Sequence, residues 1–218
     1  MITIQDFSKK NSILNRFVAE IRDAKIQTDP MRFRRNLERI GEVLAYEISK
    51  TLGYEEREVT TPLGTAKLND LKEEVVIATI LRAGLPMHQG VLNFFDRAEN
   101  AFVSAYRKHV KNENDFEVQI EYLSCPDIND KVLILTDPML ATGASMMLVY
   151  KALMTKGTPR HVHIVSAIAS MEGVRVLKRN LPKNCTIWLG AIDDELTAQA
   201  YIVPGLGDAG DLAFGEKT

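Results

Sequence analysis

The chain has 218 residues, of which 45% are hydrophobic and 26% charged, with a formal net charge of −2 at pH 7. This composition is typical of a globular protein with one large core, so we expect a single domain over residues 1–218. A net charge near zero disfavours binding to nucleic acid or to an anionic membrane surface through a strong overall field. The N-terminus lacks the apolar core of a signal peptide and no apolar run approaches the roughly 18 residues of a membrane span, so we expect a cytoplasmic protein.

The first third of the chain is predicted to be helical. Asp29-Pro30 suits a helix start, with an acidic N-cap and a proline in the first turn, and Gly53 suits the residue after a helix end. Between them, apolar residues recur at intervals of three and four, as on one face of an amphipathic helix. These residues are Phe33, Leu37, Ile40, Val43, Leu44 and Ile48. The same segment carries Arg32, Arg34, Arg35 and Arg39, for which a solvated face and an anion or subunit contact are both open interpretations.

Strands and helices alternate through the rest of the chain. Residues 57–68 are predicted to form a small β-hairpin around Pro62-Leu63-Gly64, and VVIATI (75–80) is an apolar run typical of a strand buried on both faces. The alternation predicts an α/β fold with a mostly parallel sheet flanked by helices. Further strands are predicted at 101–106, 116–123, 131–136, 163–169 and 185–192, and helices at 85–95, from 145 onwards and at 171–181.

The loop DPMLATGAS (137–145) follows one of these strands and precedes a helix. Ligands of such sheets bind beyond the carboxyl ends of the strands. Backbone amides of 142–145 at a helix N-terminus would favour a phosphate, with Thr142 and Ser145 as further donors. Asp137 is placed to accept hydrogen bonds from sugar hydroxyls. The pattern therefore indicates a ribose 5-phosphate site, although a plain strand–turn–helix junction is the alternative.

Two other strand ends and the C-terminus carry possible ligand groups. Arg82 could clamp a diphosphate, although a surface arginine gives the same pattern. Arg107-Lys108-His109 forms a second cationic cluster, and the polar KNENDF (111–116) that follows is typical of a lid. Residues 201–218, YIVPGLGDAGDLAFGEKT, interleave glycines with apolar side chains. That composition predicts an ordered loop whose backbone hydrogen-bonds a flat ligand such as a base.

Several other residues give weaker signals. His161 and His163 could share one strand face, but no third metal ligand is evident, which favours a structural role. Asp193-Asp194-Glu195 could bind a metal, although a charged helix start is favoured. Cys125 and Cys185 stand far apart in no metal-binding spacing, which favours two reduced side chains.

The sequence resembles the uracil phosphoribosyltransferase family in four motifs, in their order and spacing. They are ILRAG (80–84), AYR (105–107), DPMLATGAS (137–145) and YIVPGLGDAGDLAFG (201–215), the last being the most specific. The resemblance spans nearly the whole chain. It implies the type I phosphoribosyltransferase fold and the transfer of 5-phosphoribosyl from 5-phosphoribosyl 1-diphosphate (PRPP) to uracil, giving UMP and diphosphate in UMP salvage.

The resemblance also implies roles for individual residues. Arg82, Arg107 and Asp137 are the implied catalytic residues, with both arginines facing the diphosphate and Asp137 near the ribose hydroxyls. Mg²⁺ is implied as a partner of PRPP rather than as a protein-bound metal, and a homo-oligomer and a GTP effector are implied by some family members. The implied PRPP-binding residues are Arg82, Arg107, Asp137, Pro138, Met139, Leu140, Ala141, Thr142, Gly143, Ala144, Ser145 and Asp208. The implied uracil-binding residues are Ile202, Gly207, Asp208 and Ala209.

Two departures from the family pattern bear on these roles. Ala144 replaces a second glycine, which should narrow the backbone freedom of the loop, and KHVKNEND follows Arg107 in place of the usual continuation. Two alternative functions stay open. One is a phosphoribosyltransferase for another base, against which PGLGDAGD argues. The other is a regulator of this fold that binds RNA or nucleotide without turnover, which the arginine-rich helix keeps open.

Overall fold

The main sheet runs through the centre of the molecule. The structure is a computed structural model that describes the backbone of residues 2–109 and 116–216, and the side chains of these apart from 106–109 and 116–118. Within that part, the sheet has eight strands in the order β1-β10-β9-β7-β4-β5-β6, with β8 paired to β9. The β5–β6 pair is antiparallel and the other pairs are parallel, which confirms the predicted mostly parallel sheet. The strands are β1 Thr3–Asp6, β4 Val75–Leu81, β5 Glu99–His109, β6 Phe116–Ser124, β7 Val132–Thr136, β8 Met139–Leu140, β9 His161–Ser170 and β10 Cys185–Asp193.

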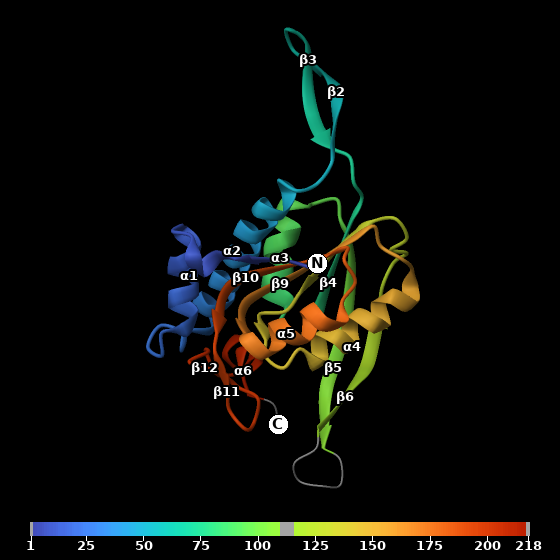
Figure 1. Cartoon of the computed structure of the whole chain (residues 1–218). Helices are drawn as coiled ribbons and strands as arrows, with labels where there is room; N and C mark the ends of the chain where they lie inside the picture. The colour runs from blue at the N-terminus through green and yellow to red at the C-terminus, as the bar shows by residue number, and fades with distance from the viewer. Residues whose placement is uncertain (1, 110–115, 217–218) are drawn as a thin grey trace.

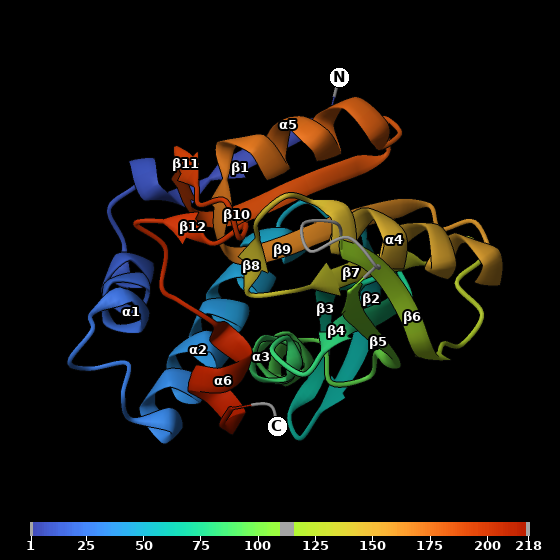
Figure 2. The ribbon, with the colours of Figure 1, turned by 90° about the horizontal axis from the view of Figure 1, so that it is seen from below.

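Helices cover both faces of this sheet (Figure 2). One face carries α1, α2, α3 and α6, and the other carries α4 and α5. Each face therefore has its own apolar core, and the unbroken apolar runs of the central strands follow from burial on both sides. The helices are α1 Ile13–Arg22, α2 Pro30–Ser49, α3 Leu85–Phe94, α4 Ala144–Leu153, α5 Met171–Asn180 and α6 Ala209–Phe214, with 3-10 turns at Phe7–Lys9 and Met154–Lys156.

Helix α2 begins and packs as its sequence predicts. The Asp29 side chain accepts hydrogen bonds from the amides of Met31 and Arg32, and Pro30 occupies the first turn. The predicted apolar stripe is buried apart from Val43, which is partly buried, and it packs in one core with residues of β4, β7 and β9. Burial of each such large side chain contributes about 1.5–3 kcal/mol, so this stripe fixes α2 on the sheet.

Two short antiparallel pairs lie outside the main sheet. The predicted hairpin is longer than expected, with β2 at Tyr54–Thr61 and β3 at Gly64–Leu71, and it projects from the body of the molecule (Figure 1). The second pair joins β11 (Glu195–Leu196) to β12 (Ile202–Val203). The expectation that Asp193-Asp194-Glu195 starts a helix is wrong, because the chain stays extended there: Asp193 ends β10 and Glu195 begins β11.

The carboxyl ends of the parallel strands gather at one edge, the lower edge in Figure 1. The C-terminal segment (residues 201–216), which contains α6, returns to the same edge, and α6 packs beside α2. None of the helices in residues 2–109 and 116–216 is long and apolar enough to cross a membrane. The fold thus brings the loop after β7, the loop after β4 and the C-terminal segment together.

Candidate active site

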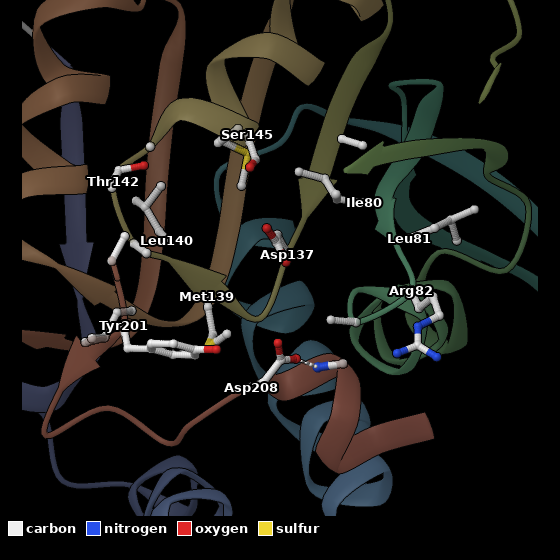
Figure 3. A pocket seen from close by; sticks show the side chains of 18 of the residues that line it. Ile80, Leu81, Arg82, Asp137, Met139, Leu140, Thr142, Ser145, Tyr201 and Asp208 are labelled. Carbon is white, nitrogen blue, oxygen red and sulfur yellow. Dashed lines mark hydrogen bonds between the residues drawn. The ribbon is translucent and has the colours of Figure 1, made fainter. Parts of the chain in front are cut away.

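A pocket of about 900 Å³ opens where these segments meet. In Figure 3, Asp137 lies at its centre, Arg82 on one side and Tyr201 on the other. Ten of the residues implied by the resemblance line the pocket: Arg82, Asp137, Met139, Leu140, Ala141, Thr142, Gly143, Ser145, Ile202 and Asp208. Within the described residues, Pro138, Ala144, Gly207 and Ala209 lie outside this lining. The pocket therefore brings together residues of all four motifs, which lie far apart in the sequence.

Several other lining residues have no role predicted from the sequence, although Ala105 and Tyr201 lie inside two of the motifs. Ser104 and Ala105 come from β5, Met146 from the first turn of α4, and Tyr201 and Glu216 from the C-terminal segment. Ser104 and Ala105 precede Arg107 at the carboxyl end of β5, and this position at the strand end is the sequence signal for them. Tyr201 lies next to Ile202 and could have been found because an aromatic ring at a pocket suits a flat ligand.

The loop after β7 (residues 137–145, the phosphate loop) is anchored to β9. The Asp137 amide donates to the Val165 carbonyl at 3.1 Å, and the Pro138 carbonyl accepts from the Ala167 and Ile168 amides at 3.1 Å. The Pro138 carbonyl thus holds the phosphate loop against β9. The backbone then reaches Gly143, whose φ of +80° is left-handed, immediately before α4 begins. Glycine suits that conformation because it carries no Cβ.

Ala144 is the first residue of α4, and its amide donates to Thr142 Oγ1 at 3.3 Å. Among the described residues other than glycine, positive φ values occur at Asp130 and Ala200, so φ at Ala144 is negative. Alanine is the best helix former, so the backbone at this position does not require glycine. The departure at Ala144 is therefore compatible with the loop conformation.

The carboxyl group of Asp137, at the centre of the pocket, has a strongly shifted pKa. Burial raises its pKa to about 7, and a hydrogen bond from the Met139 backbone acts in the opposite direction. A carboxyl group with this pKa is only partly ionised near neutral pH, and ligand hydroxyls that donate to it would favour the charged form. Such a perturbed acid in a pocket indicates a functional residue.

Arg82 lies just after β4 at the rim of the pocket. Its Nη2 atom donates to Asp211 Oδ1 at 3.3 Å and to the Gly215 carbonyl at 3.1 Å. The Arg82 side chain is about two-fifths exposed, so a cationic group lies between the pocket and the C-terminal segment. The second implied arginine, Arg107, has its backbone in β5, but its side chain lies outside the described part, as do residues 111–115 of the expected lid.

The C-terminal segment is ordered, as its composition predicts. Asp208 caps α6, because its Oδ1 atom accepts from the amides of Gly210 at 2.8 Å and Asp211 at 3.1 Å. Gly205 turns the chain with φ of +57°, and a Cβ there would lie 2.0 Å from the Ile202 carbonyl oxygen. Gly207 has φ of +91° and open space within 4 Å of a would-be Cβ, so bare backbone is presented near the pocket.

The arginines of α2 make contacts within the chain. Arg32 donates to Glu20 at 3.1 Å, and Arg34 donates to the Ala213 carbonyl at 2.6 Å. Arg35 pairs with Glu38, and Arg39 Nη1 donates to Asn36 Oδ1 at 3.2 Å. These partners account for the arginine cluster, and they weaken the observation that kept an RNA-binding regulator open.

The remaining clusters are structural. The rings of His161 and His163 lie 4.6 Å apart, and His163 Nδ1 accepts from Trp188 Nε1 at 2.9 Å. Among the side chains that the structure describes, no group of three or more His, Cys, Asp or Glu is arranged to hold a metal ion. Cys125 and Cys185 are both free thiols, as expected.

Comparisons with solved structures agree with the fold. The AQ2163 protein from Aquifex aeolicus has a similar structure, with a TM-score of 0.87 at 32% identity over 98% of both chains. A hypoxanthine phosphoribosyltransferase from Staphylococcus aureus shares the fold, with a TM-score of 0.50 at 15% identity over 75% of this chain and 76% of that one.

Sequence comparisons are more specific. A uracil phosphoribosyltransferase of Porphyromonas gingivalis is 61% identical over 208 residues, which cover 95% of this chain and 96% of the relative. One from Methanothermobacter thermautotrophicus is 42% identical over 193 residues, covering 87% and 86%. The sequence model of the uracil phosphoribosyltransferase family matches residues 8–216. The chain therefore belongs to the uracil phosphoribosyltransferase family.

Proposed function

We propose that this pocket transfers the 5-phosphoribosyl group of PRPP to uracil and so produces UMP and diphosphate. The observation that carries the proposal is that a phosphate loop, a half-buried acid, an arginine and a glycine-rich segment line one pocket. Each suits one part of the substrates: the 5-phosphate, the ribose hydroxyls, the diphosphate and the base. We take residues 1–218 as one domain, because the pocket draws on both halves of the chain.

The phosphate loop suits the ribose 5-phosphate end of PRPP. The amides at the start of α4 and the hydroxyls of Thr142 and Ser145 are donors for the phosphate, and the helix dipole adds to them. Asp137 accepts from the ribose hydroxyls, while Met139, Leu140 and the residues around them form the wall of the site.

The diphosphate and base ends lie toward the C-terminal segment. Arg82, together with Arg107, faces the diphosphate and stabilises the negative charge that develops on it as it leaves. The backbone groups of Ile202, Gly207 and Ala209 bind uracil, and Asp208 lies toward PRPP. This division gives each predicted site residue a role in one substrate.

The chemistry depends on position more than on covalent help. The bond from C1′ to the diphosphate oxygen breaks with oxocarbenium-like charge on the ribose, and diphosphate leaves with the bonding electron pair. The uracil nitrogen forms the new bond to C1′, and its proton passes to solvent water. The nearby Asp137 carboxylate stabilises the positive ribose, and the loop residues hold the reacting atoms in line. Asp137 and Asp208 carry carboxylate oxygens, the hard donors that Mg²⁺ prefers, and Mg²⁺ carried by PRPP would supply charge neutralisation at the diphosphate.

The exposure of the β2–β3 hairpin favours the proposal that the protein forms a homo-oligomer. Its residues are mostly exposed, and cross-strand ion pairs join Arg57 to Asp70 at 2.8 Å and Lys67 to Glu56 at 3.0 Å. An isolated two-stranded hairpin is marginally stable in water, so packing against another copy would stabilise it. A GTP effector stays a proposal without an assigned residue. The two free thiols support a reducing compartment such as the cytoplasm.

A base panel tests the proposed function. The protein is incubated with PRPP, Mg²⁺ and either uracil, orotate, guanine or hypoxanthine, and the products are separated by chromatography. UMP from uracil alone is expected. Conversion of another base would retain the PRPP site but contradict the role of residues 201–215, and no product with any base would favour the regulator. Salt-dependent RNA binding would then support that alternative.

A further inference from the structure

A buried carboxylate behind the pocket holds the loop formed by residues 202–207, which we call the base loop. Asp193 is 8% exposed at the end of β10. One of its oxygens accepts from Arg22 Nη2 of α1 at 2.9 Å, and the other accepts from the Gly205 amide at 3.0 Å. The carboxylate therefore bridges the N-terminal helical segment to the base loop.

This bridge meets the base loop at its sharpest turn. Gly205 is left-handed and packs so closely that a Cβ would lie 2.0 Å from the Ile202 carbonyl oxygen. Ile202 lines the pocket, and Gly207 follows two residues later. A buried amide bonded to a carboxylate makes a strong hydrogen bond that is unfavourable to lose, so it fixes the path of the backbone between Ile202 and Gly207.

Other residues of the N-terminal helical segment hold the same part of the chain. In the orientation that satisfies its amide, Gln27 donates to the carbonyls of Ile21 and Leu206, each at 2.9 Å. Arg34 donates to the Ala213 carbonyl at 2.6 Å. The base loop and α6 are thus supported from α1, α2 and the connection between them, whereas the phosphate loop is anchored to β9.

We propose that Asp193, held by Arg22, is a positioning residue for the base. Among the described residues it lies outside the pocket lining, so it acts through the backbone of the base loop. This inference rests on the proposed function and adds to it a determinant of base binding that lies behind the site. It separates the two substrates: the geometry of the uracil end depends on the Arg22–Asp193 pair, and that of the PRPP end does not.

The test is Asp193→Asn. Asparagine keeps the volume and can still accept from the Gly205 amide, but it loses the charge and turns an N–H₂ donor toward Arg22. We expect the KM for uracil to rise about tenfold, which is the effect of losing one hydrogen bond to a charged group. The Kd of Mg–PRPP, measured by calorimetry without a base, should stay within about twofold of the wild-type value, because the phosphate loop has its own anchors.

Glu20→Gln is the matched control. Glu20 is also 8% exposed and accepts from Asn36 at 2.8 Å and from Arg32 at 3.1 Å, so it joins α1 to α2. Hydrogen bonds from Asn36 and Arg32 lower its pKa to about 2. Neutralising this carboxylate should lower Tm and leave the KM for uracil unchanged. If Asp193→Asn behaves in the same way, its role is structural and the inference is wrong.

The outcomes separate this inference from the proposed function. Without UMP formation by the wild-type protein, the proposed function itself fails. With wild-type activity, an unchanged uracil KM in Asp193→Asn overturns the positioning role, as does an equal rise in uracil KM and PRPP Kd. If Asp193→Asn does not fold, Arg22→Lys decides by the same readouts. It retains the positive charge, so a smaller rise in uracil KM alone is expected, and an unchanged value overturns the inference.

Discussion

The two sides of the pocket are built in different ways. The phosphate loop is supported by elements close to it in the sequence: β7 leads into it, α4 continues from it, and Ser170 Oγ donates to the Ala141 carbonyl at 2.5 Å across 29 positions. The C-terminal segment depends on residues much farther away. Arg34 reaches Ala213 across 179 positions, and Arg82 reaches Gly215 across 133. Substitutions on the first side should therefore change PRPP binding, and those on the second should change uracil binding.

Asp137→Asn gives the largest expected effect. Two hydrogen bonds from ribose hydroxyls to a carboxylate, at about 1.5 kcal/mol each, correspond to a loss of about a hundredfold in kcat/KM. Steady-state kinetics with PRPP as the varied substrate measures it. The control is Asp130→Asn, an exposed residue paired with Arg160, where asparagine also tolerates the φ of +56°. Equal kinetics in both variants would remove Asp137 from the reaction.

The raised pKa of Asp137 gives a pH dependence of known sign. Because its pKa is raised from 3.8 to about 7 by burial, the carboxyl is mostly protonated below that value. We expect kcat/KM for PRPP to fall about tenfold per pH unit below about 7, and the fall should be absent in Asp137→Asn.

Proton release gives a second measurement of the same group. Hydroxyl donors favour the carboxylate, so PRPP binding at pH 6.5 should release more protons from the wild type than from Asp137→Asn, as calorimetry in buffers of different ionisation enthalpy would show. Folding stability changes in the opposite direction to activity: the free-energy penalty for the ionised Asp137 carboxylate is fully present above about pH 7 and is relieved as the pH falls toward 3.8. Equal proton release from both proteins would contradict the raised pKa.

This contrast also explains what could be predicted from the sequence. The alternation of strands, the amphipathic α2 and the phosphate loop depend on residues within one or two turns of each other, and the structure confirms the predicted elements to within a few residues. The support of the base loop could not be predicted, since Asp193 meets Arg22 across 171 positions. The charge pattern of Asp193-Asp194-Glu195 describes local structure and predicts a helix start, whereas the two partners of Asp193 come from the tertiary fold. The edge strand β1 is likewise defined by its pairing with β10.

Arg82→Ala tests the residue that connects the two sides of the pocket. Arg82 is expected to bind the diphosphate, and it also contacts Asp211 and Gly215 of the C-terminal segment. Loss of one charge-assisted hydrogen bond, about 1.5–3 kcal/mol, should lower kcat/KM by about tenfold or more. Unlike Asp137→Asn, this variant should also raise the KM for uracil. A change in the kinetics for PRPP with an unchanged KM for uracil would show that the contacts of Arg82 to the C-terminal segment do not affect base binding. Unchanged kinetics for both substrates would remove Arg82 from the mechanism.

Gly143→Ala and Ala144→Gly form a pair that should give the smallest effects and the finest test of the phosphate loop. An alanine at position 143 would have to adopt a φ of +80°, and its Cβ would lie 3.2 Å from the Val176 side chain. The left-handed conformation alone disfavours alanine by about 1 kcal/mol, so the Kd of PRPP should rise about fivefold while the KM for uracil stays unchanged. Ala144→Gly places glycine in the first turn of α4, where it should lower Tm slightly, since glycine in a helix is less stable than alanine by up to about 1 kcal/mol. A tighter Kd for PRPP in Ala144→Gly would mean that alanine does restrict the loop, as the family pattern implies, and that the helical conformation at Ala144 is not the one that binds phosphate.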